Sequence, residues 1–409
     1  MTEQDYIIVG QGIAGSILAY LLHENGQKVV VIDQNTEGSL SSSKIAAGVI
    51  NPITGRRFVK SWHVDTLLSS AKQTYQALEK VLNIPIWHER RILRTLTNAE
   101  EENNFLLRRS YPDYQMYCGE SHALLTEFED DSVKWDPSVF HDFYAFAETK
   151  NGAQVNLSLL VSKLRAYFID NQMFINEKFS FNDLTIEENA VIYKNIKAKK
   201  IIFAEGAAAT QNPYFSWLPF NLDKGELLLV RIPNLNLTAI FKHKISIVPL
   251  HDLKNTAENA SDTEGSSDFG FRISDFGNTS KNPTSDIQNP KYTEGSYFEN
   301  LYWVGATNAW HFEHNLPTEA HKQLILNELR EILNCPFEVV AHHAAIRPTV
   351  KDRRPFIGQH PQFPVLGIFN GFGTKGASLV PFFAEQFVDN LLNGKPLEKE
   401  VDIKRFQHT

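Results

Sequence analysis

The sequence is poor in cysteine, in long apolar runs and in excess positive charge. Its 409 residues include only two cysteines, Cys118 and Cys335. Two are too few for a disulfide framework or a cysteine-rich metal cluster, as is usual in a reducing cytoplasm. No stretch approaches the ~20 apolar residues of a membrane span. The apolar pattern that begins at Tyr6 leaves no room for a signal peptide, so we expect a cytoplasmic location.

Charge and length narrow the class of protein further. The formal net charge of −8 argues against a protein that binds nucleic acid through its overall charge, although a local basic patch stays compatible with it. Hydrophobic residues make up 42% of the chain and charged residues 22%, as in an ordinary globular protein. A chain of 409 residues exceeds the size at which one core keeps growing, so two domains are expected.

The most informative stretch is residues 6–33, YIIVGQGIAGSILAYLLHENGQKVVVID. An apolar run meets the turn Gly10-Gln11-Gly12-Ile13-Ala14-Gly15, a stretch of helical periodicity follows, and a second apolar run ends at Asp33. Strand, glycine turn, helix, strand and acid in this order are typical of the first βαβ unit of a dinucleotide-binding fold. A pyrophosphate would lie at the helix N-terminus, and the acid would accept hydrogen bonds from ribose hydroxyls.

The order of the predicted helices and strands after residue 33 suggests that the chain leaves the nucleotide-binding domain and later returns to it. Small and apolar residues mix in 34–62, which favours a loop lying against a flat ligand over a flexible surface loop. Helical periodicity predicts helices over 64–82, 152–168 and 318–334. Short strands are predicted over 172–181, 190–196 and 302–307, and a buried one over 200–206 that returns to the parallel sheet. Residues 225–250 are predicted to form antiparallel strands, and 251–294 a hairpin with long loops.

Near the C-terminus a strand over 365–370 leads into Gly371-Phe372-Gly373-Thr374-Lys375-Gly376 and a helix that reaches Leu392. This is formally a second GxGxxG, but no strand ending in an acid follows, so a second nucleotide site is not expected. The helix start is still electropositive and suited to stabilising negative charge on a ligand.

Six stretches taken together resemble the D-amino-acid-oxidase superfamily of flavoproteins, especially its glycine oxidase and sarcosine oxidase branch. They are GQGIAG, SKIAAGVINP, IIFAEGA, KGELL, WVGAT, and IRPTVKDRRPFIG through GFGTKG. They occur in the family's order over nearly the whole length. The resemblance implies an α/β fold with a Rossmann-like FAD-binding domain and a parallel sheet, interleaved with an antiparallel-sheet substrate domain. We expect the FAD domain to comprise 1–82, 146–215 and 336–409, and the substrate or lid domain 83–145 and 216–335.

The resemblance also implies a set of site residues around non-covalent FAD. Those that would hold the cofactor are Gly10, Gly12, Ile13, Ala14, Gly15, Asp33, Gln34, Ser43, Ala46, Ala47, Gly48, Val49, Gly206, Gly371, Phe372, Gly373, Thr374, Lys375 and Gly376. Arg347 matches the arginine that pairs with a substrate carboxylate. Lys375 would place a cation near the flavin or the oxygen site, and the alternative is that it points to solvent.

The implied activity is oxidation of the C–N bond of an amino acid or N-substituted glycine-like amine by hydride transfer to flavin N5. The electron acceptor would be oxygen or a quinone, and no metal is expected. Two departures narrow the branch: Thr374-Lys375 replaces the arginine-asparagine pair of glycine oxidases, and Ser246 stands where some relatives carry a tyrosine. Both argue against glycine itself as substrate, and the lack of a cysteine near 371–376 argues against covalent flavin.

Two alternatives stay open. GFGTKG and RPTVKDRRPFIG also resemble the oxidase domain of the bacterial tRNA wobble-uridine modification enzyme, which would imply a flavin dehydrogenase acting on a larger substrate. The acidic charge balance argues against RNA. A flavin-binding protein without turnover is the other alternative, since a fold alone does not fix function. Asp352, Arg353 and Arg354 are interpreted as a solvated turn or an ion pair. The oligomeric state is not predicted.

Overall fold

The computed structural model describes residues 1–34, 41–123, 139–233, 235–250 and 300–406. The predicted hairpin over 251–294 lies outside these ranges. Within them, no helix combines the length and apolarity needed to cross a bilayer.

The smaller of two large sheets has a parallel centre. Its strand order there is β9-β2-β1-β12-β19, and all four pairings are parallel. The chain thus returns to the parallel sheet at β12, as predicted. The parallel strands are β1 (Thr2–Val9), β2 (Val29–Asp33), β9 (Phe174–Asn176), β12 (Ile196–Phe203) and β19 (Leu366–Asn370). Antiparallel strands at the rim are β10 (Leu184–Ile186), β11 (Val191–Tyr193) and β18 (Phe356–Gln359).

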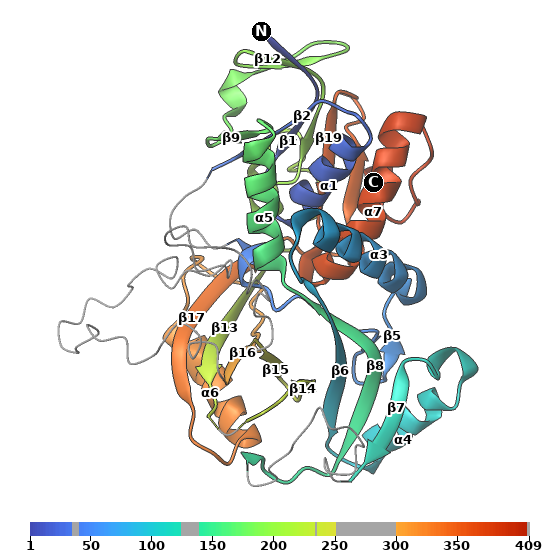
Figure 1. Ribbon diagram of the computed structural model, residues 1–409, viewed down its shortest axis with the longest axis vertical. Helices are drawn as coiled ribbons and strands as arrows, with labels where there is room; N and C mark the ends of the chain where they lie inside the picture. The colour runs from blue at the N-terminus through green and yellow to red at the C-terminus, as the bar shows by residue number, and fades with distance from the viewer. Residues whose placement is uncertain (35–40, 124–138, 234, 251–299, 407–409) are drawn as a thin grey trace, which may run out of the picture.

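Strand β1 is buried on both faces, which explains its unbroken apolar run. Ile8 belongs to a core on one face, where α1 and α7 pack, and Ile7 and Val9 belong to a second core on the other. Figure 1 shows this sheet in the upper part of the molecule, with helices α1, α5, α3 and α7 beside it. Their bounds are α1 (Ile13–Glu24), α3 (Val64–Leu82), α5 (Leu157–Asp170) and α7 (Gly376–Asn393). The prediction of a helix over 64–82 is confirmed.

The predicted helix start at Gly152 is wrong. Residues 152–155 are the end of a long strand, β8, in which Gly152 pairs with Arg90 and Val155 with Trp87 of β6. Helix α5 begins only after Asn156, whose side chain accepts a hydrogen bond from the backbone N–H of Leu159. The helix therefore starts at an ordinary N-cap, and pairing with a distant strand decides the residues before it.

The larger sheet is mostly antiparallel and curves through the lower part of Figure 1. Its strand order is β17-β13-β16-β15-β14-β6-β8-β3, with β7 beside β8, and only the β14–β6 pairing is parallel. The bounds are β3 (Val49–Ile50), β6 (Trp87–Leu96), β7 (Cys118–His122), β8 (Ala145–Val155), β13 (Asp223–Arg231), β14 (Ile240–Lys242), β15 (Ser246–Pro249), β16 (Leu301–Gly305) and β17 (Glu338–Arg347). The remaining elements include α2 (Ser42–Ile45), α4 (Ala99–Arg109), α6 (Glu319–Ile332), β4 (Ile53–Thr54) and β5 (Val59–Lys60).

The membership of the sheets differs from the expected domain boundaries at three places. β3, β8 and β17 pair within the larger sheet, whereas the expected boundaries assign them to the FAD domain. β8 and β17 connect elements of the two sheets, because α5 follows β8 directly and β18 follows β17. Boundaries drawn from the order of the predicted elements do not locate such a crossing, and the division into domains stays a prediction.

A buried carboxylate attaches α6 to the back of the larger sheet. The side chain of Glu226 is fully buried, and its carboxylate accepts hydrogen bonds from the Thr318 backbone N–H at 2.8 Å and the Thr318 hydroxyl at 3.0 Å. It also contacts Lys224 Nζ at 3.0 Å, His321 Nδ1 at 2.9 Å and His342 Nε2 at 2.9 Å. Burial by itself raises the pKa of Glu226, but the hydrogen bonds from Thr318, Lys224 and His321 outweigh it and lower that pKa below its usual value.

We predict that Glu226→Ala lowers the free energy of unfolding by about 3–5 kcal/mol, because it leaves Lys224 buried without its counter-charge. Urea denaturation followed by circular dichroism measures it. Glu338→Ala is the matched control, since it removes the acid of an exposed pair with Arg231 and should cost at most about 1 kcal/mol. Equal effects of the two substitutions would contradict the structural role of Glu226.

Candidate active site

A cavity of about 510 Å³ lies where the carboxyl ends of the parallel strands face the larger sheet. β1, β2, β12 and β19 are parallel, so the residues at or just after their ends reach the same edge: Gly10, Asp33, Ala204 and Asn370 all line the cavity. In open α/β sheets this edge is where ligands bind.

The glycine turn after β1 is packed too tightly for side chains at two positions. Gly10 has a φ of +98°, and a Cβ there would lie 2.5 Å from the carbonyl oxygen of Ala204 at the end of β12. A Cβ on Gly15 would collide with the carbonyl oxygen of Gly10. The N-terminus of α1 is therefore held directly against the sheet edge. One of its first amides, Ile13 N–H, donates to Ser43 Oγ at 3.1 Å.

Asp33 is held by a network that the sequence did not reveal. Arg165 of α5 donates from Nη2 to Asp33 Oδ2 at 2.9 Å and from Nε to Gln11 Oε1 at 2.6 Å. The backbone N–H of Gln11 donates to the same Asp33 oxygen at 3.2 Å. Burial raises the pKa of Asp33, and Arg165 opposes that effect. Arg165 thus fixes Asp33, the acid expected to bind the ribose. The sequence offered one sign of this role, because Arg165 is a charged residue on an otherwise apolar helix face.

Two hydrogen bonds hold the loop over 41–49 and the segment that enters the C-terminal turn in place around the cavity. Trp303 of the larger sheet donates from Nε1 to the carbonyl oxygen of Ile45 at 2.9 Å. Asn370 donates from Nδ2 to the carbonyl oxygen of Gly206 at 3.0 Å. The loop over 41–49 is therefore a structured wall of the cavity.

Most predicted cofactor residues share this one cavity. Those that line it are Gly10, Gly12, Ile13, Ala14, Asp33, Gln34, Ser43, Ala46, Ala47, Gly48, Val49, Gly206, Phe372, Gly373, Thr374 and Gly376. Gly15 lies behind the first turn, and Gly371 and Lys375 line a second, adjoining cavity. Residues more than 300 positions apart in the sequence thus meet at one place.

Arg347, at the end of β17, lines the same cavity. Its Nη1 donates to Asp223 Oδ2 at 2.6 Å, to Asn308 Oδ1 at 3.0 Å and to the Thr307 carbonyl oxygen at 3.3 Å. The guanidinium lies over Gly225, where a Cβ would collide with Nη2 and Cζ. All three hydrogen bonds use Nη1, so Asp223 orients the side chain through that atom. Nη2 and Nε are the remaining donors of the guanidinium.

A lysine that the sequence analysis missed also lines the cavity. Lys242 of β14 faces the same space as Ser246 of β15, and its Nζ donates to Ser246 Oγ at 3.4 Å. Burial and the charge of Arg94 lower the pKa of Lys242. Ile240 and Lys242 are two positions apart on one strand and therefore share a face, and Ile240 lines the cavity too. This spacing was the sign in the sequence that could have identified Lys242.

The two adjacent histidines of β17 point to opposite faces of the sheet. His342 lies under α6 against Glu226, and burial lowers its pKa although Glu226 acts the other way. His343 pairs in register with Leu227, which lines the cavity, and burial lowers the pKa of His343 to about 4. His343 is therefore neutral near pH 7.

The residues at the edge fit a dinucleotide such as FAD. Gly10 and Gly15 have no room for a side chain, and the close packing that results brings the backbone amides at the start of α1 to the cavity, where they can meet a pyrophosphate. Asp33 is placed to accept hydroxyl hydrogen bonds. The small residues Ala46, Ala47 and Gly48 form a wall with little side-chain bulk, as a flat ring system requires.

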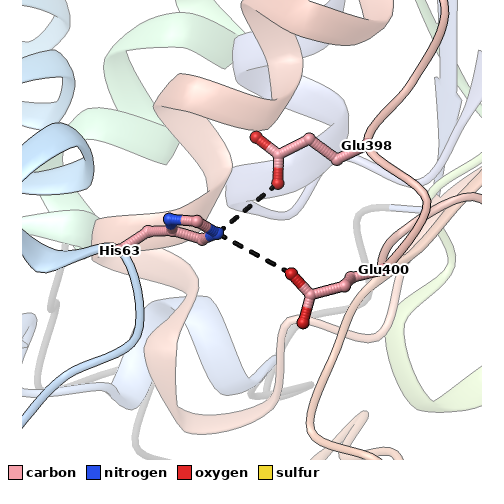
Figure 2. A group of neighbouring side chains, drawn as sticks. All are labelled: His63, Glu398 and Glu400. Atoms are coloured by element: carbon pink, nitrogen blue, oxygen red, sulfur yellow. Dashed lines mark ion pairs between the residues drawn. The ribbon is translucent and has the colours of Figure 1, made fainter.

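Two groups of histidine and glutamate in the described part of the chain come close enough to hold a metal ion. In one, shown in Figure 2, His63 Nε2 lies 3.7 Å from Glu398 Oε2 and 3.8 Å from Glu400 Oε2. Glu400 is also paired with Arg354 at 3.3 Å, so the group acts as an ion-pair cluster. In the other, His243 lies near Glu328 and Glu331, which are both paired with Lys244.

Comparison with known proteins adds a family and a set of similar folds. The model of the DAO family, described as FAD dependent oxidoreductase, matches residues 5–390. A glycine oxidase from Geobacillus kaustophilus superposes with a TM-score of 0.70 at 19% identity, covering 97% of this chain and 96% of that one. An iminodiacetate oxidase from Chelativorans sp. BNC1 superposes with a TM-score of 0.66 at 18% identity, covering 98% of each chain. At these identities the structures show a shared fold.

An acid in the cavity wall predicts a pH dependence of stability. Glu205 follows β12, is half-buried, and accepts a hydrogen bond from Asn212 Nδ2 at 2.8 Å. Its partial burial raises its pKa from 4.5 to about 7. Because the native state binds this proton more tightly than the unfolded state, the contribution of Glu205 to stability is fully present below pH 4.5 and is lost as the pH rises to about 7.

In the apoprotein we therefore expect the stability of the wild type to fall by about 3 kcal/mol relative to Glu205→Gln between pH 4.5 and 7. The glutamine side chain stays neutral, so the difference isolates this one group from all other titrations. Urea denaturation of both proteins across the pH range measures it. A difference that does not change with pH would contradict the raised pKa of Glu205.

Proposed function

The chain belongs to the DAO family of FAD-dependent oxidoreductases, and from this premise we propose that it oxidises the C–N bond of an amino acid or an N-substituted glycine-like amine. One observation carries the proposal. Arg347, a cation oriented by Asp223, lies in the same cavity as the glycine turn and the wall of small residues. A carboxylate-bearing amine bound to Arg347 would have its α-carbon next to the cofactor.

The side chains around Arg347 divide the work of binding and orientation. Asp223 and Asn308 hold Nη1, so the fork meets the substrate carboxylate in a fixed orientation. Apolar side chains of Ile92, Ile240 and Val248 form one cluster that also lines the cavity and would exclude water from the reacting carbon. A fixed approach of this kind supplies much of the rate enhancement when the cofactor carries the difficult step.

FAD, held by the glycine turn over 10–15 and the small residues Ala46, Ala47 and Gly48, would supply the acceptor for a hydride from the carbon next to nitrogen. The amine loses its proton in the same oxidation, and the resulting imine is hydrolysed by water to a carbonyl compound and an amine or ammonia. Lys242 and Ser246 offer polar atoms near the reacting group, and the lowered pKa of Lys242 makes it a better proton acceptor than an ordinary lysine. An oxygen or quinone acceptor and a cytoplasmic location stay predictions from the sequence.

We predict that Arg347→Ala lowers kcat/KM for carboxylate-bearing amines by an amount equivalent to about 2–5 kcal/mol, the range for removing one partner of a buried charge pair. The protein is loaded with FAD and desalted, and anaerobic bleaching of its visible flavin bands by a panel of amines is recorded. Arg231→Ala, which removes an arginine from the far end of β13, is the control. Unchanged turnover in Arg347→Ala would refute the assignment, and bands that no amine bleaches would favour a flavin-binding protein without turnover.

Gly225→Ala should test whether the position of Arg347 sets substrate binding. Its Cβ would collide with the tip of a flexible side chain, Arg347, so the backbone can stay in place while the guanidinium moves away from Asp223. Because the buried Asp223 then loses its partner, we expect the free energy of unfolding to fall by about 3–5 kcal/mol, and KM for the carboxylate-bearing amine to rise about tenfold. Urea denaturation and steady-state kinetics on the same preparation test this, and an unchanged KM would show that the position of Arg347 is not critical.

A further inference from the structure

A second cavity of about 800 Å³ adjoins the first at the end where Arg347 lies. The two share six lining residues, namely Val49, Asn51, Asn308, Phe372, Gly373 and Thr374. Asp223 lines the second cavity, and Arg347, its ion-pair partner, lines the first. A ligand held by Arg347 can therefore extend into the second cavity, which we call the vestibule.

The charged side chains of the vestibule are nearly all positive. Lys351, Arg353, Arg354 and Lys375 line it, and Asp223 is the one acid among the lining residues that the structure describes. That acid is already paired with Arg347 at 2.6 Å. The protein as a whole has a net charge of −8, so four cations around one cavity make the local charge opposite in sign to the overall charge. A positively charged wall of this kind raises the local concentration of anions.

Arg354 is fixed in this wall. Its guanidinium carbon lies 3.9 Å from the centre of the Trp62 ring, which stacks on Phe383. Its Nε lies 3.3 Å from Glu400 Oε1, and Glu400 belongs to the ion-pair cluster with His63 and Glu398 drawn in Figure 2. The C-terminal segment and the residues before α3 thus hold this cation in place without a ligand.

Lys375 and Arg353 differ from Arg354 in having no carboxylate within 4 Å among residues 1–34, 41–123, 139–233, 235–250 and 300–406. Lys375 Nζ donates to Ser61 Oγ at 3.3 Å, and the side chain of Arg353 is exposed. Lys375 is exposed, but partial desolvation by the surrounding residues and the charges of Arg354 and Arg353 lower its pKa. Like charges thus crowd at this position, and an anion between them would relieve the repulsion.

We propose that the substrate is an amine with a second anionic group, a carboxylate or phosphate on its nitrogen substituent, which binds in the vestibule between Lys375 and Arg353. This substrate class rests on the proposed function, because Arg347 would hold the first carboxylate. Trp310, which is exposed, also lines the vestibule, so a short organic chain between the two anionic groups has aromatic surface to pack on.

The dimensions favour a small molecule over a nucleic acid. Both cavities fall in the usual range of ligand pockets, ~300–1,000 Å³, and the cations gather at one cavity within an acidic protein. A polynucleotide requires an extended positive face along which several phosphates bind. We therefore assign the vestibule to a single anionic group.

The test uses two ligands that differ by that group alone: N-methylglycine and iminodiacetate, in which a carboxymethyl group replaces the methyl group. Calorimetric titration of the FAD-loaded protein gives both dissociation constants without any need for turnover. We expect iminodiacetate to bind about tenfold more tightly or better, with a preference that shrinks as ionic strength rises. N-(phosphonomethyl)glycine then separates phosphate-like from carboxylate recognition.

Lys375→Gln and Arg353→Gln should each reduce this preference roughly fivefold, the effect of one partly exposed ion pair. Lys404→Gln, which neutralises an exposed lysine outside both cavities, should leave the preference unchanged. The proposal would be overturned by equal affinities for the two ligands, by no measurable iminodiacetate binding at millimolar concentration, or by an unchanged preference in a variant that combines Lys375→Gln with Arg353→Gln. So would an oligoribonucleotide that displaces iminodiacetate.

Failure of the proposed function gives a different result. In that case no amine bleaches the flavin bands, while the preference between the two ligands and its loss in the variants stay measurable. Turnover of N-methylglycine without any preference for iminodiacetate would support the function and refute the second anionic group.

Discussion

The alternation of side chains along β13 is the constraint on which both halves of the molecule depend. Asp223, Gly225 and Leu227 face the cavities, while Lys224 and Glu226 face α6. Successive residues of a strand point to opposite sides of the sheet, so one short segment carries two separate charge systems. The pair on the α6 side attaches the helix, and the pair on the cavity side orients Arg347. A shift of register by one residue would exchange the two.

The parallel edge depends on close backbone approach in a similar way. Gly10, Gly15 and the end of β12 leave no space between them, so α1 starts against the sheet and its first amides are near the cavity. The larger sheet is connected to this edge through Trp303 and the loop over 41–49. The cavity is thus lined by residues of both sheets, and Arg347, Lys242 and Ser246 come to it from the larger one.

The local patterns of the sequence predicted the helices and strands, but they did not predict the contacts between segments that are distant in the sequence. The apolar stripe of 64–82 and the strand-turn-helix order of 6–33 are properties of neighbouring residues, and both predictions are confirmed. Residues 152–155 appeared helical because the periodicity after them is helical, whereas pairing with β6, more than 60 positions earlier, decides their conformation. Arg165 and Asp33 are 132 positions apart, and Arg347 and Asp223 are 124 apart. Arg353 and Arg354, interpreted from sequence as a solvated turn or an ion pair, line the vestibule because the turn over 371–375 folds beside them.

The charge around the cavities also explains why Arg347 alone is an incomplete anion site. Arg347 and Asp223 form a neutral pair, so a substrate carboxylate placed on the guanidinium experiences attraction from one partner and repulsion from the other. Net attraction then requires further positive charge, and Lys375 and Arg353 line the adjoining vestibule, where they can supply it. The pKa values of Lys242 and Lys375 are lowered in the free protein. An anion bound near them would raise those values again, because the charged form gains a partner. Binding of an anionic substrate is therefore coupled to protonation of Lys242 and Lys375. A substrate with two anionic groups can place one near each lysine and gain affinity from each.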